Sequence, residues 1–291
     1  MFHRVAVVGL GLIGGSLGLA LRQAHAAEQV VGYDLGRGVG EQARRIGAID
    51  QAHDTLADAV RGAELIIVAT PVGTMRALLQ DLATMASPGA VITDVASTKS
   101  QVISWAEEFL PGNLYFVGGH PMAGKEVSGV EAADPTLFRD RIYCLTPTRK
   151  TSPAALNRVS LMIETLGGRV RFLEPAEHDG QVAQVSHLPF VAAAALMNTV
   201  AGGSSWGDSA LLASSGFRDT TRLAAGSPEM YRDICVTNSE AVVRALDEYL
   251  AALRAFRESI ATRDSHLNEL FARSQELRQR WQATHDGMEQ E

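Results

Sequence analysis

Cysteine is nearly absent from the 291-residue chain, which contains only Cys144 and Cys235. The two lie far apart and in no CxxC pattern, so they can build neither a disulfide framework nor a cysteine-based zinc site. We therefore expect no metal site, and a reducing cytoplasm is the expected compartment.

Positive charge and long apolar runs are also scarce. The 26 Lys and Arg are outnumbered by 33 Asp and Glu, which gives a formal net charge of -7, and no basic stripe is present to neutralise a run of phosphates. The uncharged stretches 5–21 and 182–207 are interrupted by glycines, and the second also contains Gln184 and Asn198. We expect neither nucleic acid nor a membrane as a partner, and we interpret residues 5–21 as mature protein, not as a secretion signal.

The first half of the chain alternates Val- and Ile-rich runs with amphipathic stretches, which is typical of βαβ units. The predicted strands are 5–8, 30–33, 65–69, 91–93 and 115–117, and the predicted helices are 12–22, 39–46, 75–85 and 101–110. A strand at 143–146, a helix at 153–166 and a strand at 170–173 should extend the same domain. The pattern predicts an α/β fold whose N-terminal domain, residues 1–174, is a doubly wound Rossmann-type domain.

The second half has a helical pattern throughout. Helices are predicted over 182–200, 230–260 and 263–282, so residues 175–291 should form an all-helical domain for substrate binding and dimerisation. Apolar residues recur at three- and four-residue steps along one face: Leu246, Leu250, Leu253, Phe256 and Ile260. Either a second copy covers this face and the protein is a homodimer, or the face packs within the monomer.

A glycine fingerprint follows the first predicted strand and opens a helix: Gly9-Leu10-Gly11-Leu12-Ile13-Gly14. Such a turn presents backbone N–H groups and the positive end of the helix dipole to a dinucleotide diphosphate. Asp34 ends the second strand, where a carboxylate accepts ribose hydroxyl hydrogen bonds and repels a 2′-phosphate. The sequence therefore predicts NAD as cofactor, although the cation Arg37 lies nearby; Thr70 and Pro71 should complete the site at the next strand end. The alternative is that the glycines serve tight packing and Asp34 a turn.

A candidate proton acceptor, His120, follows the strand predicted at 115–117. It lies among Gly118, Gly119 and Gly124 on what should be a loop at the carboxyl edge of the sheet, where open α/β sheets bind ligands. Ser97 follows the neighbouring strand and could hydrogen-bond His120. The alternatives are an ordinary loop histidine and a helix N-cap serine.

Four motifs in this order resemble those of prephenate/arogenate (cyclohexadienyl) dehydrogenases. They are DxxSTK at 94–99, GGHPMAG at 118–124, SHLP at 186–189 and GFRDTTR at 216–222. With the glycine fingerprint, the resemblance covers about residues 3 to 260. It implies an NAD-dependent enzyme that converts prephenate to 4-hydroxyphenylpyruvate on the route to tyrosine, with arogenate or dual specificity as the alternative.

The resemblance also implies roles for single residues. His120 would act on the ring hydroxyl, Ser97 would hydrogen-bond it, and Arg222 would hold a substrate carboxylate. It also implies substrate-binding roles for Ser186, His187 and Glu126, and we add Lys125, the neighbour of Glu126, as a further candidate. The alternatives are that His187 is a packing residue at the start of a helix and that Arg222 is a surface cation beside Asp219.

Two positions depart from the family pattern. Lys125 stands where relatives have a small hydroxyl residue, and Phe190 stands where some prephenate-specific members have histidine. A lysine would attract the side-chain carboxylate without an ammonium group opposing it, which favours prephenate.

Two other classes remain as rivals. A β-hydroxyacid or 6-phosphogluconate type of dehydrogenase shares the glycine fingerprint, but it generally uses a lysine of its helical domain, and no lysine follows Lys150. A protein that senses NAD without turnover is the other rival. About thirty residues follow the helical half, so we expect a monofunctional enzyme without an appended regulatory domain, and inhibition by tyrosine should be competitive.

Overall fold

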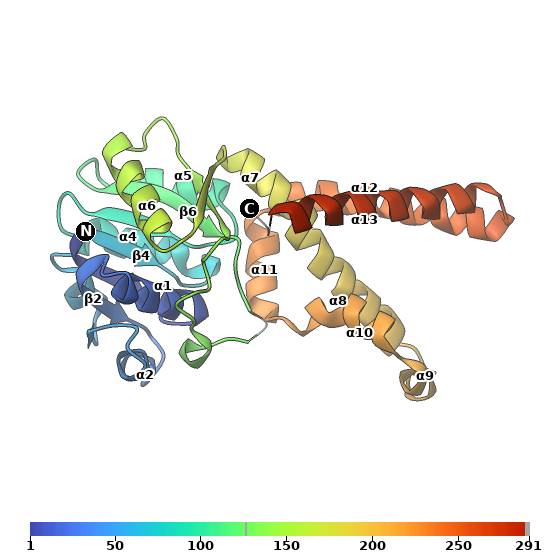
Figure 1. Ribbon diagram of the computed structural model, residues 1–291, viewed down its shortest axis with the longest axis horizontal. Coiled ribbons are helices and arrows are strands. Elements are labelled where there is room, and N and C mark those ends of the chain that lie inside the picture. Colours follow the sequence, from blue (N-terminus) through green and yellow to red (C-terminus); the bar gives the residue numbers. More distant parts are fainter. Residues whose placement is uncertain (126, 289–291) are drawn as a thin grey trace. The chain divides into compact units, whose positions relative to one another are not determined.

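The computed structural model describes residues 1–125 and 127–288, and it divides into two compact units, Met1–Ser239 and Glu240–Glu291. An eight-stranded sheet, counted over the described residues, forms the first half of the first unit, in the order β3-β2-β1-β4-β5-β6-β7-β8 (Figure 1). Its strands are β1 Phe2–Val8, β2 Ala27–Tyr33, β3 Gln51–Ala52, β4 Leu65–Val68, β5 Val91–Asp94, β6 Tyr115–Pro121, β7 Ile142–Thr146 and β8 Arg169–Phe172.

Helices cover both faces of this sheet, because successive residues of a buried strand point to opposite sides. In β1, Val5 and Val7 belong to one apolar cluster, while Ala6 and Val8 belong to the other. The first cluster is completed by α1 Leu12–Gln23, α2 Val39–Arg45 and α6 Pro153–Thr165; the second by α3 Leu56–Val60, α4 Met75–Met85 and α5 Ser100–Phe109. This confirms the prediction of a doubly wound Rossmann-type domain.

The sheet is parallel except at one junction. β6 and β7 pair antiparallel, with His120 opposite Cys144, and β8 pairs parallel with β7. β6 also continues to Pro121, so the expectation that His120 lies on a loop was wrong. The glycines at 118 and 119 allow the strand to continue close to its neighbours, since a Cβ at Gly119 would lie 2.6 Å from the Asp94 carbonyl oxygen.

The helical half of the first unit follows β8. It comprises α7 Pro175–Val182, the π-helical turn η3 Ala183–His187, α8 Leu188–Ala201, α9 Trp206–Leu212, α10 Ser215–Thr221, the 3₁₀ turn η4 Arg222–Ala225 and α11 Pro228–Thr237. Two further 3₁₀ turns, η1 Val72–Thr74 and η2 Val130–Ala132, lie within the sheet domain. The predicted helical character is confirmed. The domain limits 1–174 and 175–291 remain a prediction, because the compact unit that contains the sheet extends through α11.

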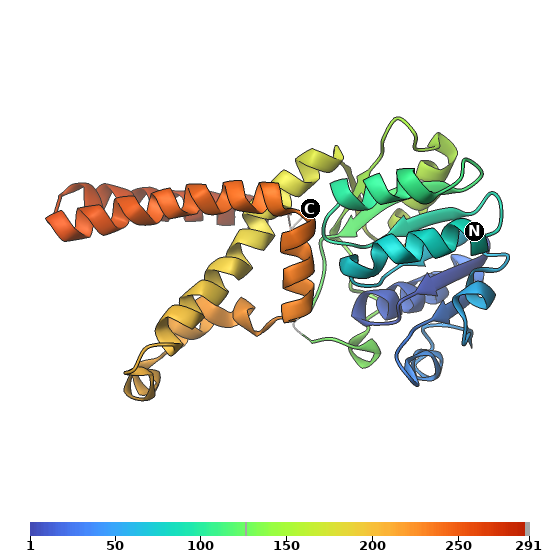
Figure 2. The same ribbon diagram turned by 180° about the vertical axis from the view of Figure 1, so that it is seen from behind.

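The second unit consists of most of α12 Ser239–Thr262 together with α13 His266–Met288, which run side by side as a hairpin (Figure 2). Phe256 and Phe271 join the two helices with ring centroids 5.2 Å apart. The helix predicted over 230–260 is therefore two helices, α11 and α12, separated at Asn238.

Among the described residues, no single helix is both long and apolar enough to cross a membrane. One pair bent by 120°, Pro175–Ala201 with Trp206–Leu212, meets that test only when its two members are taken together.

Candidate active site

A buried row of three polar side chains lies where the carboxyl ends of β5 and β6 meet α7. His120 Nδ1 is 2.9 Å from His178 Nε2, and His178 Nδ1 is 2.9 Å from Asp179 Oδ1. All three are buried, at 8%, 0% and 4% exposure respectively. The sheet supplies the first residue and the helical half supplies the other two.

Asp179 is anchored as an acceptor at the N-terminus of α5. The backbone N–H groups of Lys99 and Ser100 donate to its two oxygens at 2.7 and 2.8 Å. Burial raises the pKa of the Asp179 carboxyl, but the hydrogen bonds from His178, Ser100 and Lys99 outweigh it, and the pKa falls below its ordinary value. Asp179 is therefore a carboxylate at neutral pH.

This anchored carboxylate determines which ring nitrogens carry protons. Because Asp179 can only accept, His178 donates from Nδ1 and its Nε2 is left with a lone pair. That lone pair accepts the proton on His120 Nδ1, so His120 Nε2 is unprotonated. Burial, followed by the charges of His178, Lys99 and His187, lowers the pKa of His120 well below 6.5. His120 is thus a neutral imidazole with a lone pair available to accept a proton.

His187 joins the same region through Asn238. The Asn238 amide donates to the Asp179 carbonyl oxygen at 2.9 Å and lies 3.2 Å from His187 Nδ1. With Nδ1 accepting, the proton of neutral His187 is on Nε2, a buried atom that has no hydrogen-bond partner among the described residues. Burial lowers the pKa of His187 to about 4. A neutral donor of this kind suits a substrate oxygen.

Aromatic contacts lead from His187 toward Arg222. Phe190 lies 5.8 Å from the His187 ring and stacks on Tyr231 at 3.9 Å between centroids. Arg222, exposed at the start of η4, is close enough to Tyr231 for its charge to oppose the rise that burial causes in the Tyr231 pKa. Phe190, one of the two departures from the family pattern, therefore packs in the apolar core beside Tyr231.

The other predicted substrate-binding residues make no described hydrogen bond to His120 or His187. Ser97 and Ser186 are half-buried, and no hydrogen bond joins Ser97 to His120 in the described part of the chain. The N-cap position of α5 belongs to Lys99, so the alternative interpretation of Ser97 as the cap was wrong. The Lys125 ammonium pairs with Asp134 at 2.9 Å. Glu126 lies outside the described residues.

The glycine fingerprint has the geometry of a dinucleotide turn. Gly9 adopts φ +92° directly after β1, and a Cβ at Gly14 would overlap the Gly9 carbonyl oxygen, so α1 packs directly against the turn. A Cβ at Gly11 would meet nothing within 4 Å, which leaves the space before the helix open. The first N–H groups of α1, those of Leu12, Ile13 and Gly14, face this opening without intrahelical acceptors.

Asp34 closes the far side of the turn. Its oxygens accept from the backbone N–H groups of Leu10 and Gly36, each at 2.7 Å. These bonds orient the carboxylate at the end of β2 and leave lone pairs for ribose hydroxyls. Thr70 and Pro71 follow β4, and Thr70 Oγ1 accepts from the Thr74 hydroxyl at 2.9 Å. The residues present fit an NAD molecule.

Sequence reasoning missed His178, Asp179 and Asn238. The adjacent His-Asp pair in the first helix after the last strand was a usable signal, since that junction faces the carboxyl edge of the sheet. Asn238 carried no signal, because its role depends on where α11 ends in space.

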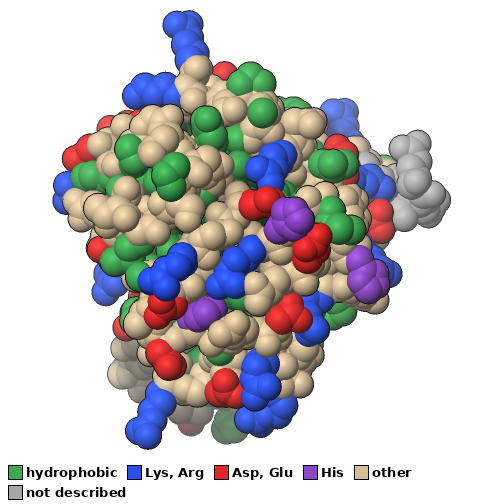
Figure 3. Space-filling view, turned by 90° about the vertical axis from the view of Figure 1, so that its left-hand side faces the viewer, with side chains coloured by type: hydrophobic (Ala, Val, Ile, Leu, Met, Phe, Trp, Pro, Cys, Tyr) green, Lys and Arg blue, Asp and Glu red, His purple; other side chains and the backbone are tan. Residues whose placement is uncertain are grey.

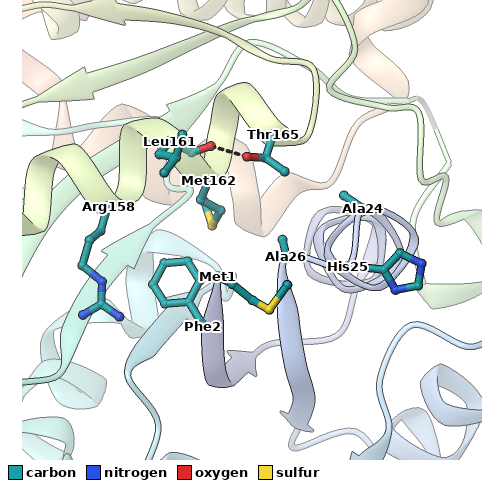
Figure 4. A pocket seen from close by; sticks show the side chains of 9 residues that line it. All are labelled: Met1, Phe2, Ala24, His25, Ala26, Arg158, Leu161, Met162 and Thr165. Atoms are coloured by element: carbon teal, nitrogen blue, oxygen red, sulfur yellow. Dashed lines mark hydrogen bonds between the residues drawn. The ribbon is translucent and has the colours of Figure 1, made fainter.

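For the rest of the molecule, the features of interest are metal ligands, cavities and surface charge. The described residues contain no group of three His, Cys, Asp or Glu side chains able to hold a metal ion. A cavity of about 280 Å³ is lined by Phe2, His25 and Arg158 (Figure 4). Phe2 begins β1 and His25 precedes β2, whereas His120 is near the carboxyl end of β6. On the face seen in Figure 3, basic and acidic side chains are interspersed.

Comparisons with known proteins identify the chain's relatives. Residues 17–172 match the family described as prephenate dehydrogenase, nucleotide-binding domain, and residues 174–275 match prephenate dehydrogenase, dimerization domain. The chain is 35% identical to a prephenate dehydrogenase of Bacillus subtilis over 91% of this chain and 72% of that protein. It is 33% identical to a cyclohexadienyl dehydrogenase of Zymomonas mobilis over 98% of each.

A solved structure agrees with these relatives. The prephenate dehydrogenase of A. aeolicus, in complex with hydroxyphenyl propionate and NAD+, superposes with a TM-score of 0.90 at 32% identity. The match covers 96% of this chain and 98% of that one.

Proposed function

The chain belongs to the prephenate dehydrogenase family of NAD-dependent oxidoreductases, and from this premise we propose that it converts prephenate to 4-hydroxyphenylpyruvate by oxidative decarboxylation. The observation that carries the proposal is the neutral His120 imidazole, hydrogen-bonded through Nδ1 to the His178–Asp179 pair. A base of this kind at the carboxyl edge of a dinucleotide-binding sheet suits the oxidation of an alcohol.

The proposed chemistry uses that base in one step. His120 Nε2 takes the proton of the ring hydroxyl as the ring carbon loses a hydride. The α1 turn, Asp34, Thr70 and Pro71 would hold NAD, which would supply the hydride acceptor. The ring carboxylate then leaves as CO₂, and the electrons of the broken C–C bond complete the aromatic ring and place a negative charge on the ring oxygen. That phenolate oxygen takes back the proton held by His120, which gives the hydroxyl group of the product and restores the neutral imidazole.

The His178–Asp179 pair stabilises the protonated state that follows. Once His120 has gained a proton at Nε2, its Nδ1–H donates a charge-assisted hydrogen bond to His178 Nε2. The Asp179 carboxylate holds His178 in the tautomer that accepts this bond and attracts the positive charge. In neutral form the same pair keeps Nε2 free of a proton. The pair thus favours the correct tautomer before the reaction and the imidazolium after it.

We propose one substrate contact for each of three residues. Arg222 holds a carboxylate bidentately, His187 Nε2–H donates to a substrate oxygen, and Ser97 hydrogen-bonds the ring hydroxyl. Ser186, Lys125 and Glu126 are proposed to line the remainder of the pocket. Because Lys125 is paired with Asp134, its attraction for a second carboxylate is weaker than that of an isolated ammonium.

We further propose that the protein is a cytoplasmic homodimer. The α12–α13 hairpin exposes large apolar side chains that include Leu250, Leu253, Leu277 and Trp281. The region from 174 to 275 matches a model described as a dimerization domain. A second copy of the chain would remove these side chains from water.

The deciding experiment measures NADH formation at 340 nm with prephenate and with arogenate, each with NAD and with NADP. Turnover of prephenate with NAD, accompanied by release of CO₂, is expected. A larger kcat/KM for arogenate would change the assigned substrate. Failure to turn over either acid, with NAD binding intact, would leave the NAD-sensing alternative.

A further inference from the structure

Lys99 and Asp94 form a buried ion pair that contacts the backbone of Gly119, the residue before His120. Both side chains are fully buried, and the Lys99 ammonium contacts an Asp94 carboxylate oxygen. Buried pairs of this kind add little net stability compared with apolar residues of the same size. Stability alone therefore gives a weak reason for placing two charges here.

The pair holds the backbone of the residue before His120 from both sides. The Lys99 ammonium donates to the Gly119 carbonyl oxygen at 2.6 Å, and the Gly119 N–H donates to Asp94 Oδ1 at 3.0 Å. Gly119 is the residue that fits, because a Cβ there would lie 2.6 Å from the Asp94 carbonyl oxygen. The position of the His120 backbone is thus set by two charged hydrogen-bond partners.

Lys99 also holds the other end of the row. Its backbone N–H donates to Asp179 Oδ1 at 2.7 Å, the same oxygen that accepts from His178. The contacts close a ring that passes from Lys99 through Gly119, His120, His178 and Asp179 and returns to Lys99. Fixing one residue at both ends leaves the two imidazoles little freedom to separate.

We propose that Lys99 and Asp94 are positioning residues for the dehydrogenase reaction, which clamp Gly119 so that His120 keeps its hydrogen bond to His178 and presents Nε2 to the substrate. This inference rests on the proposed function. A misplacement of about 1 Å at a reacting group can lower the rate about 10²-fold. The charge of Lys99 also contributes to the low pKa of His120, after burial and His178.

Several charged or titratable groups face His120 from the elements packed around it. They are His178 and Asp179 on α7, His187 on η3, Cys144 on β7, Asp94 on β5, and Lys99. Burial lowers the pKa of the Lys99 ammonium below its ordinary value, against the opposing charge and hydrogen bond of Asp94. Removing the Lys99 side chain leaves the His178–Asp179 bond in place, because Lys99 contacts Asp179 through its backbone N–H.

The test compares the double variant Asp94→Asn/Lys99→Met with the single variant Lys99→Met and with Lys150→Met. The double variant leaves no charge buried alone, whereas Lys150 pairs with Glu107 at the surface and serves as the matched control. We expect the double variant to fold and to bind NAD within about threefold of the unmodified protein. Its kcat should fall by about 10- to 100-fold with little change in KM, and the acidic limb of kcat/KM should move to higher pH.

A double variant that folds and keeps kcat within about twofold would overturn the proposal. So would a double variant that does not fold, because the pair would then serve stability.

Nuclear magnetic resonance of ¹⁵N-labelled histidine separates this inference from the proposed function. The His120 signals, assigned by their loss in His120→Asn, should show a proton on Nδ1 in the unmodified protein and a mixture of tautomers in the double variant. If the unmodified protein turned over neither acid but this difference appeared, the clamp would stand and the proposed function would fail. Identical tautomers in both proteins would refute the clamp.

Discussion

The low pKa of the His120 imidazole has two opposing effects on its ability to take a proton from the substrate. A low pKa, caused first by burial and then by His178, Lys99 and His187, keeps its lone pair available at neutral pH. The same low pKa makes it a weaker base. In the proposed reaction, loss of CO₂ with formation of an aromatic ring would supply the driving force that such a base lacks, and the hydrogen bond to His178 would stabilise the imidazolium.

Replacing His120 with asparagine should lower kcat by about 10²-fold or more, because the hydroxyl proton loses its acceptor. NAD affinity, measured by fluorescence titration, should be unchanged, since the α1 turn is untouched. His25→Asn is the matched control: His25 is exposed and has φ +50°, a conformation that asparagine tolerates. Near-normal turnover by His120→Asn would refute its role as base.

Protonation of His187 should destabilise the fold at acidic pH. Its pKa is about 4 in the folded chain against 6.5 for an unperturbed histidine, so the unfolded chain binds the proton first as pH falls. The stabilisation is complete above pH 6.5 and is lost between 6.5 and about 4. The difference corresponds to about 3 kcal/mol.

Urea unfolding at a series of pH values measures this loss. The free energy of unfolding should fall between pH 6.5 and 4 in the unmodified protein and fall less in His187→Gln. Parallel curves for the two proteins would show that another group is responsible.

At the scale of elements, two glycines near the N-terminus of α1 have different roles: Gly14 allows close packing, and Gly11 leaves space for the cofactor. Gly14→Ala places a methyl group against the Gly9 carbonyl oxygen, so the helix must move and stability should fall by about 1–3 kcal/mol. Gly11→Ala meets no protein atom within 4 Å, so the melting temperature should be kept while NAD binding weakens at least about tenfold. Thermal melts and NAD titrations of the two variants measure both effects. A Gly11→Ala protein with normal NAD affinity would place the diphosphate elsewhere.

For the whole molecule, the exposed apolar residues of α12 lead to a prediction about the oligomeric state. Light scattering should give twice the chain mass of 31.1 kDa for the unmodified protein. The double variant Leu250→Glu/Leu253→Glu should shift the mass toward one chain. Each leucine is 45% exposed in the single chain, and a glutamate at either position would be buried in the dimer interface at a cost in free energy. Arg257→Glu, an exposed polar change on the same helix, should leave the mass unchanged. A monomeric unmodified protein would contradict the proposed dimer.

The elements with a strong local pattern were predictable from the sequence. Helix α4 begins and ends at the predicted residues, Met75 and Met85, because an amphipathic period over eleven residues is set by local spacing. The two-residue strand β3 and the short helix α3 were missed, since neither is long enough to show a period. The break at Asn238 was missed for a different reason: apolar spacing continues across it.

By itself, the sequence determined the α/β order of the sheet domain and the glycine turn with Asp34, and it led to the prediction of His120 as the base. Each of these depends on residues that are neighbours in the chain or on one strand and its following turn. Only the tertiary structure decided that β7 runs antiparallel to β6, which makes His120 part of a strand. It also decided which residues surround that histidine, because His178 is 58 residues away and Asn238 lies 51 residues beyond His187. Spacing along a chain fixes local conformation, whereas the partner of a buried polar atom is fixed by packing between distant elements.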